Sequence, residues 1–172
     1  VDRYMETLKA FEIFYDGKGL DFFIPKNDEV DFSLIPASHQ KKYIVFAIGG
    51  TYLTKRLPLE KMIAVCKKIK YPIFLLGGPE DKPTGDQIRS AIGDRIYNGC
   101  GMFNVNQAAS IIKKARKVIT HDTGAMHIAA AFNKSIISIW GNTVPEFGMY
   151  PFLKNKRRKA HRQDFSIRHF RC

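Results

Sequence analysis

The chain has 172 residues, of which 45% are hydrophobic and 26% are charged, a composition that excludes an intrinsically disordered protein. No apolar run approaches the roughly 20 residues of a membrane-spanning helix, and the first residues lack the apolar core of a secretory signal. The formal net charge is +12, and residues 153–172 contain eight Lys and Arg residues against one Asp. The composition therefore indicates a folded domain with a basic C-terminal tail over 153–172.

The three cysteines, Cys66, Cys100 and Cys172, are an odd number and show no metal-ligand spacing. Free thiols fit a reducing compartment best, so the sequence favours a cytoplasmic protein. Because the chain starts at Val1 and stops abruptly at Cys172, we expect it to be a piece of a longer protein.

Residues 1–40 are expected to form a linker helix and an interdomain connector. Tyr4, Leu8 and Phe11 recur at helical spacing within the first 14 residues. The stretch 20–36 is irregular and rich in Pro, Asn, Asp and Glu, which is typical of a linker.

Residues 41–152 show the pattern of an α/β domain. Apolar runs without period-2 alternation follow one another, separated by helical segments, which is typical of a parallel sheet covered on both faces. We expect strands at 43–48, 73–76, 94–97, 118–120 and 135–140, and helices at 58–70, 86–92, 105–115 and 124–132. The sequence thus predicts a Rossmann-like, doubly wound parallel sheet, whose ligands bind along the carboxyl edge of the strands.

The loop that follows the first expected strand offers groups for an anion. Gly49 and Gly50 let backbone approach a ligand, Thr51 supplies a hydroxyl, and Lys55 and Arg56 supply cations. The order of residues is not that of a P-loop. Alone the loop is also consistent with a solvated turn, but beside the later 120–127 turn it becomes a candidate phosphate clamp.

The loop after the second strand ends in two acids. Glu80 is equally consistent with binding ribose hydroxyls, as acids do in dinucleotide-binding folds, and with a place at a helix start. For Asp81 the helix-start interpretation is favoured.

Residues 120–127 form the most informative stretch, a strand end, a sharp polar turn and the start of a helix. Backbone N–H groups and the positive end of a helix dipole at such a junction favour phosphate. Thr123 is a good N-cap, Gly124 permits close approach, and His127 either donates to a phosphate oxygen or is bonded to backbone. Thr143, in the loop after the last strand, either touches substrate or caps a turn.

Metal binding and nucleophilic catalysis are both disfavoured. His121, Asp122 and His127 are possible metal ligands, but no further Cys or His supports them, so no metal is expected. The Gly-x-Ser-x-Gly elbow of Ser-His-Asp hydrolases is absent from the sequence.

Two runs, 122–131 and 135–145, resemble glycosyltransferase family 9, the ADP-heptose:lipopolysaccharide heptosyltransferases. The family motif is Asp-Ser/Thr-Gly-x-x-His, followed by an apolar strand and Gly-x-Thr. The segments 54–58 and 77–80 look like the other two donor-side motifs of the family, in the same order. The resemblance spans about residues 43–145.

The resemblance implies a GT-B fold, in which two Rossmann-like domains flank the active site, and this chain is similar to the C-terminal, donor-binding half. By resemblance Lys55, Gly124 and His127 contact the donor diphosphate, Asp122 lies under the diphosphate or binds the donor sugar, and Glu80 holds the ribose. The full donor-binding prediction comprises Thr51, Lys55, Glu80, Asp122, Thr123, Gly124, His127 and Thr143.

The general base of the family lies in the N-terminal domain, so the resemblance implies no catalytic residue in this fragment and no activity of the fragment alone. It implies an ADP-heptose-like donor without a metal cofactor, and an anionic lipid-linked glycan such as lipopolysaccharide core as acceptor. The expected partner is the N-terminal domain of the same protein. The basic tail would allow peripheral contact with the inner membrane.

Two other functions remain open at this point. The domain could be a non-catalytic nucleotide-binding or regulatory unit that has kept the fold. It could also be a basic nucleic-acid module, although few aromatic residues lie among its cations, so nucleic acid is not expected as a partner.

Overall fold

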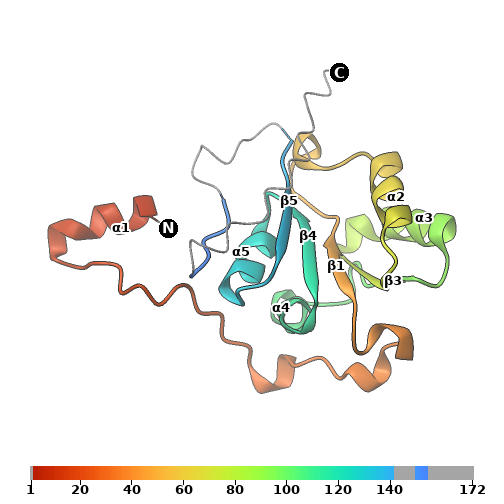
Figure 1. The fold of residues 1–172 in the computed structure, drawn as a ribbon, viewed down its shortest axis with the longest axis horizontal. Coiled ribbons are helices and arrows are strands. Elements are labelled where there is room, and N and C mark those ends of the chain that lie inside the picture. The colour runs from red at the N-terminus through yellow and green to blue at the C-terminus, as the bar shows by residue number, and fades with distance from the viewer. Residues whose placement is uncertain (1, 142–149, 155–172) are drawn as a thin grey trace.

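The computed structural model describes residues 2–141 and 150–154 (Figure 1). Within them, parallel strands form one sheet in the order β3-β2-β1-β4-β5. The strands are β1 Ile44–Ala47, β2 Ile73–Leu76, β3 Ile96–Asn98, β4 Lys117–His121 and β5 Ile136–Ile139. The helices are α1 Asp2–Leu8, α2 Leu59–Lys68, α3 Lys82–Ile92, α4 Val105–Lys114 and α5 Gly124–Ala131. The predicted α/β class and parallel sheet are confirmed.

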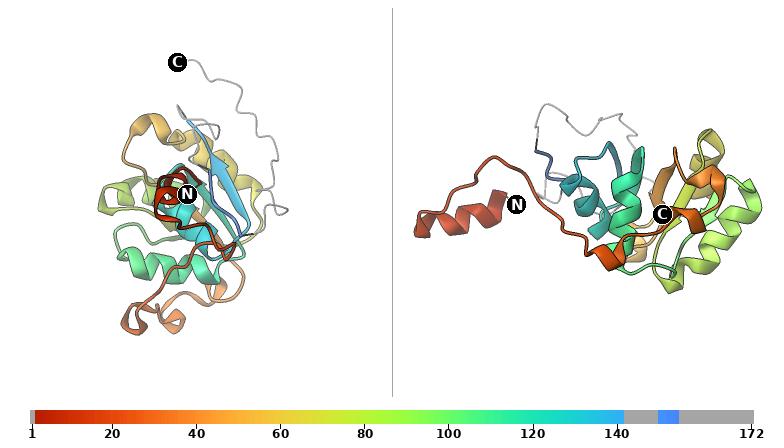
Figure 2. Two further views of the ribbon diagram at one scale, coloured as in Figure 1. Left: turned by 90° about the vertical axis from the view of Figure 1, so that its left-hand side faces the viewer. Right: turned by 90° about the horizontal axis from the view of Figure 1, so that it is seen from below.

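Helices cover both faces of this sheet (Figures 1 and 2). α2 and α3 pack on the face that carries Phe46 and Leu75, and α4 and α5 pack on the face that carries Val45 and Phe74. Side chains alternate between the two faces along a strand. Because both faces are buried, the strands contain uninterrupted apolar runs, as the sequence predicted.

The strand order places the switch point of the sheet at β1 and β4. From β1 the chain moves outward through β2 to β3, and then returns to add β4 and β5 on the other side of β1. Ala47 at the end of β1 is paired in register with Thr120 of β4. The loops after these two strands therefore leave the carboxyl edge side by side, where doubly wound sheets bind their ligands.

Some boundaries differ from the prediction. α3 begins at Lys82 rather than at 86, directly after the short 3-10 helix η6, Pro79–Asp81. Pro83 is compatible with the first helical turn, where its missing N–H is not needed. The glycine at position 85 has a packing reason, because a Cβ there would collide with the carboxamide of Asn98.

The N-terminal region is only partly attached to the sheet domain. Residues 26–39 run along the core, where Val30 N–H donates to the Ser110 hydroxyl and the Asp28 carboxylate accepts from Asn104, the N-cap of α4, and from Asn106 in its first turn. The first helix, α1, ends at Leu8 and is therefore shorter than the helical spacing of the first 14 residues predicts. It projects from the body of the domain in Figures 1 and 2. The division into 1–40, 41–152 and 153–172 stays a prediction, and 155–172 lie outside the described residues.

Two of the three cysteines are buried in the domain. Cys66 and Cys100 are free thiols with exposed fractions of at most 1%. Burial raises the pKa of the Cys66 thiol to about 11 and that of Cys100 to about 12. Both therefore remain protonated at neutral pH and act as small apolar residues. Among the described residues, no helix is both long and apolar enough to cross a membrane.

Candidate functional site

An ion pair joins the loops that follow β1 and β4. Lys55, at the end of the 3-10 helix η5 Leu53–Lys55, places its Nζ 2.7 Å from Oδ2 of Asp122. The Asp122 side chain is 7% exposed and that of Lys55 is 23% exposed. The structure thus brings together two residues that are 67 positions apart in the chain. A cation at this edge that can still be reached from solvent is suited to an anionic ligand.

The amino end of α5 lies immediately beside this pair. Thr123 is the N-cap residue, and its hydroxyl lies 3.2 Å from that of Thr120 rather than bonding a backbone N–H of the helix. Gly124 is exposed, and a Cβ placed on it would meet nothing within 4 Å. A side chain at the first residue of α5 would therefore meet no protein atom, so this helix terminus is open to a ligand, as an anion-binding helix terminus requires.

His127 is exposed on the first turn of α5. Partial desolvation lowers the pKa of its imidazole, and the nearby charge of Asp122 opposes this shift. The ring is therefore mainly neutral at pH 7, with one N–H that can donate to a ligand.

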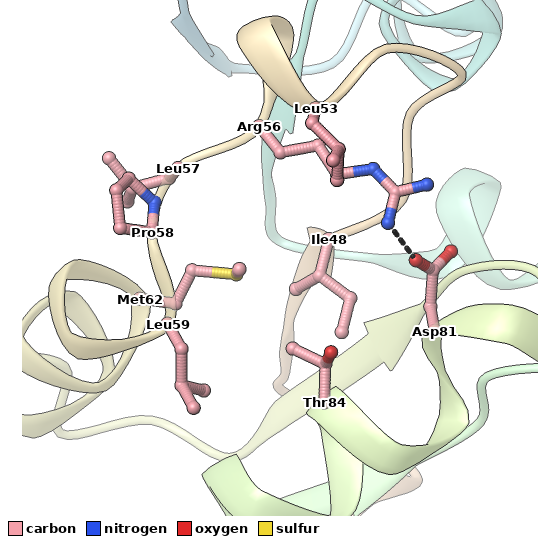
Figure 3. Close-up of a pocket in the computed structure, with 9 residues that line it drawn as sticks. All are labelled: Ile48, Leu53, Arg56, Leu57, Pro58, Leu59, Met62, Asp81 and Thr84. Atoms are coloured by element: carbon pink, nitrogen blue, oxygen red, sulfur yellow. Dashed lines mark hydrogen bonds and ion pairs between the residues drawn. The ribbon is translucent and has the colours of Figure 1, made fainter. Parts of the chain in front are cut away.

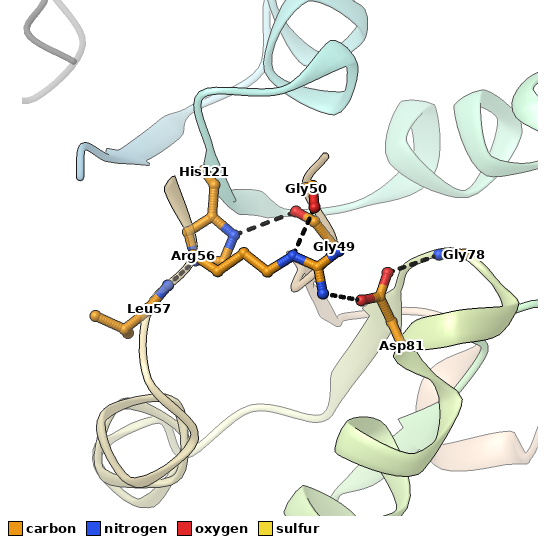
Figure 4. A network of polar contacts seen from close by, with 7 residues as sticks. All are labelled: Gly49, Gly50, Arg56, Leu57, Gly78, Asp81 and His121. Carbon is orange, nitrogen blue, oxygen red and sulfur yellow. Dashed lines mark hydrogen bonds and ion pairs between the residues drawn. The ribbon is translucent and has the colours of Figure 1, made fainter. Parts of the chain in front are cut away.

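A second ion pair is formed by Arg56, the residue that follows Lys55. Nη1 of Arg56 is 2.8 Å from Oδ1 of Asp81, and Nε of the same guanidinium donates to the carbonyl of Gly50 at 2.5 Å (Figure 4). The other oxygen of Asp81 accepts from the N–H of Gly78 at 2.9 Å. Asp81 is 2% exposed. This pair joins the loops after β1 and β2.

His121, the last residue of β4, is fully buried and bonds the β1 loop at two points (Figure 4). Its Nε2 accepts from the N–H of Leu57 at 3.0 Å, and its Nδ1 faces the carbonyl of Gly49 at 3.4 Å. These partners require a neutral ring with its proton on Nδ1. His121 is therefore a structural residue here rather than a metal ligand.

The other predicted site residues lie around this edge, with one exception. Thr51 and Glu80 are exposed, in the loops after β1 and β2 respectively. The β1 loop reaches the α5 junction, because a Cβ on Gly50 would lie 3.5 Å from a methyl carbon of Thr123. Thr143 lies outside the described residues. In the part of the chain that is described, no three His, Cys, Asp or Glu side chains are grouped to hold a metal.

A hollow of about 260 Å³ opens between the first turns of α2 and α3 (Figure 3). Its walls are mainly apolar, and the Arg56–Asp81 pair forms one of them. The lining residues are Ile48, Leu53, Arg56, Leu57, Pro58, Leu59, Met62, Asp81 and Thr84. Of the predicted donor-binding residues that the structure describes, none lines it, so the predicted site is the open sheet edge and not this hollow.

Comparison with known proteins decides the family of the chain. The profile of glycosyltransferase family 9 (heptosyltransferase) matches residues 1–164. The chain belongs to this family. The resemblance seen in the motifs is thereby confirmed.

Among curated family 9 proteins, lipooligosaccharide heptosyltransferase 2 of Haemophilus influenzae is 37% identical over 81 residues, which are 45% of this chain and 23% of that protein. Lipopolysaccharide heptosyltransferase 2 of Salmonella typhimurium is 29% identical over 136 residues, which are 74% of this chain and 38% of that protein. The chain therefore spans well under half the length of these relatives.

Solved family 9 structures share the fold. A glycosyl transferase family 9 protein from Veillonella parvula superposes with a TM-score of 0.74 at 21% identity, covering 92% of this chain and 47% of that one. E. coli ADP-heptose LPS heptosyltransferase II gives a TM-score of 0.64 at 23% identity, covering 73% and 40%. Because the family members are GT-B enzymes, the predicted Rossmann-like half of such a fold is confirmed.

The family motifs did not predict the Arg56–Asp81 pair. The spacing predicts Asp81 as an acid at a helix start, and its bond to the Gly78 N–H agrees with that prediction. Its pairing with Arg56, 25 residues away in the chain, was not predicted. A signal was present in the glycines that end β1 and β2. A Cβ on Gly49 or Gly77 would collide with the Asp81 side chain, so both residues leave room for that carboxylate.

The buried His121 makes the stability of this family 9 domain depend on pH. Burial, together with the charge of Arg56, lowers the pKa of His121 below its ordinary 6.5, while Asp81 and the Gly49 carbonyl oppose the shift. The unfolded chain then binds more protons below about pH 6.5. We expect the free energy of unfolding to be level above that pH and to fall as the pH drops through it, measured by urea denaturation from pH 8 to 5.

His39 and His127 also have lowered pKa values and act in the same direction. The test therefore compares the loss of unfolding free energy in acid between the wild-type chain and His121→Asn, in which only His39 and His127 still contribute to it. A smaller loss of unfolding free energy in the variant, as the pH falls from 8 to 5, supports the assignment to His121. Equal losses in both proteins would contradict it.

Proposed function

We propose that this chain is the C-terminal, donor-binding half of an inverting glycosyltransferase that transfers heptose or a related sugar from an ADP-sugar. The observation that carries the proposal is the Lys55–Asp122 pair beside the open amino end of α5, at the switch point of the sheet. A similar E. coli heptosyltransferase was solved with ADP, and another structure of it holds ADP-2-deoxy-2-fluoro heptose. These relatives support an adenosine diphosphate donor.

The chemistry of the proposed site is that of a leaving-group pocket. As the glycosidic bond breaks, negative charge develops on the departing diphosphate. Lys55, the N–H groups that begin at Gly124, and the His127 imidazole can each stabilise that charge without a metal ion. Glu80 and Thr51, exposed on the neighbouring loops, are proposed to hold the ribose and a phosphate oxygen.

Catalysis needs a base to deprotonate the acceptor hydroxyl, and we propose that this base belongs to an N-terminal domain. The isolated 172 residues are then expected to bind donor but not to transfer sugar. The proposed acceptor is an anionic lipid-linked glycan of the lipopolysaccharide core type. The eight cations of the C-terminal tail would favour a cytoplasmic location at the surface of the inner membrane.

Isothermal titration of the 172-residue chain with ADP tests the donor assignment. We expect ADP to bind, and we expect Asp122→Asn and His127→Ala to weaken binding by about 5- to 50-fold each, or roughly 1 to 2.3 kcal/mol, which lies between the loss of a neutral and of a charge-assisted hydrogen bond. Their melting temperatures should stay within a few degrees of the wild-type value. UDP, which carries uracil in place of adenine, is the control for recognition of the nucleobase.

Three results would overturn parts of the proposal, one each from titration with ADP and ADP-heptose, from thermal melting, and from a sugar-transfer assay. Absence of binding by ADP and ADP-heptose would leave a domain that kept the fold without the donor. Equal loss of thermal stability in Asp122→Asn and His127→Ala would mark both residues as structural. Measurable sugar transfer by the 172 residues would contradict the proposed location of the base.

A further inference from the structure

We infer that Arg56, Asp81 and His121 are positioning residues, which hold the loop of residues 49–58 so that the Lys55 ammonium meets the donor diphosphate. We name residues 49–58 the Lys55 loop. The inference rests on the proposed function, because it concerns the cation proposed to bind the diphosphate. It assigns roles to three side chains that do not belong to the predicted donor-binding set.

Asp81 is the centre of the arrangement. Its carboxylate accepts from Gly78 N–H at 2.9 Å and from the Arg56 guanidinium at 2.8 Å. The carboxylate also occupies the space in which Cβ atoms on Gly49 and Gly77 would lie. One buried acid therefore contacts the glycines that follow β1 and β2 and, through Arg56, the Lys55 loop (Figure 4).

Arg56 and Lys55 are adjacent cations that pair with acids from different strands. Arg56 pairs with Asp81, which follows β2, while Lys55 pairs with Asp122, which follows β4. The guanidinium also donates to the Gly50 carbonyl, which closes the loop on itself. With Arg56 anchored on one side, the backbone of Lys55 is held and its ammonium is directed to the β4 side.

The loop is held at further points along its length. His121 bonds the N–H of Leu57 and faces the carbonyl of Gly49, so β4 holds both ends of the loop. Near its middle, a Cβ on Gly141 would collide with the carbonyl oxygen of Thr54 and lie 3.0 Å from Cα of Lys55. The carboxyl end of β5 therefore packs directly against the residue that carries the cation.

Two of the three residues, Asp81 and His121, are buried too deeply to touch a donor, whereas the Arg56 side chain is 22% exposed, much as that of Lys55 is. Asp81 and His121 are 2% and 0% exposed, whereas the Lys55 side chain is 23% exposed. The buried groups must therefore act on ligand affinity through the loop. Holding the loop in advance removes the cost of ordering it when the ligand binds, which raises the affinity.

A double-mutant cycle with ADP tests this role. Titration calorimetry would compare the wild-type chain, Asp81→Asn, Lys55→Met and the double variant. Asp81→Asn keeps the shape of the side chain but removes the charge that holds Arg56. We expect it to weaken ADP binding about 10-fold. In the Lys55→Met background the same change should have almost no further effect, because the cation that it positions is gone.

Asp86→Asn is the matched control. It is the same substitution at an exposed acid of the adjoining helix α3, where Asp86 accepts a hydrogen bond from the amide of Asn98. It should leave ADP affinity unchanged. Should Asp81→Asn fail to fold, Arg56→Lys takes its place, because it keeps the cation but loses the two-sided guanidinium contact.

The outcomes separate this inference from the proposed function. If Asp81→Asn lowers ADP affinity by the same factor with and without Lys55, or lowers only the melting temperature, the three residues are merely structural and the inference is overturned. If the wild-type chain does not bind ADP at all, the proposed function fails and the inference falls with it.

Discussion

Replacing Lys55 by Met should weaken ADP binding by roughly 10- to 100-fold, the range of a charge-assisted contact to phosphate. The expected loss follows from the placement of Nζ at the switch point of the sheet, beside the amino end of α5. Methionine keeps most of the apolar stem, so the variant removes the charge with little change in packing. Calorimetric titration at low and moderate salt would measure the change.

The control for this variant is Lys67→Met, at an exposed position in the last turn of α2, away from the carboxyl edge of the sheet. It should bind ADP as the wild-type chain does. A second arm uses adenosine, which has no phosphate and should bind both lysine variants equally. If Lys55→Met keeps full ADP affinity, or loses adenosine affinity equally, Lys55 does not contact the diphosphate.

Gly49→Ala should destabilise the domain by about 3 kcal/mol, a drop of roughly 6 to 12 °C in melting temperature. The new methyl group would collide with a carboxylate oxygen of Asp81. Either the strand end or the buried acid must then move, and movement of Asp81 would disturb its pairing with Arg56. Thermal unfolding followed by circular dichroism would measure the effect.

Gly124→Ala provides the matched comparison, since a Cβ at Gly124 meets nothing within 4 Å. Alanine is also the better helix former at the start of α5. This variant should melt at or slightly above the wild-type temperature. A Gly49→Ala protein as stable as Gly124→Ala would show that the strand end has no steric requirement for glycine.

Most of the fold could be predicted from the sequence because its signals are local. Buried strands such as 73–76 are short apolar runs followed by glycine, and the observed β2 has these same bounds. The helix predicted over 86–92 begins four residues earlier in the structure, at Lys82, so that α3 includes Pro83 and Gly85. Their tolerance depends on the first-turn position of Pro83 and on Asn98, a residue of the strand β3.

The candidate site could be predicted only in part. The motif residues Lys55 and Asp122 were both named in advance, and the structure pairs them at 2.7 Å. Motif matching did not find Asp81 and His121 as partners of the Lys55 loop. Their roles depend on burial and on hydrogen bonds to residues 25 to 72 positions away.

The sequence by itself determined the family, the parallel sheet and the 120–127 junction, since each depends on residue types in a short stretch. Only the tertiary structure decided how the loops after β1, β2 and β4 meet. Their meeting depends on strand order, which puts β1 between β2 and β4. It also depends on two charge pairs and a buried imidazole, which hold one loop against two others. Such contacts join residues distant in the chain, so no local pattern contains them.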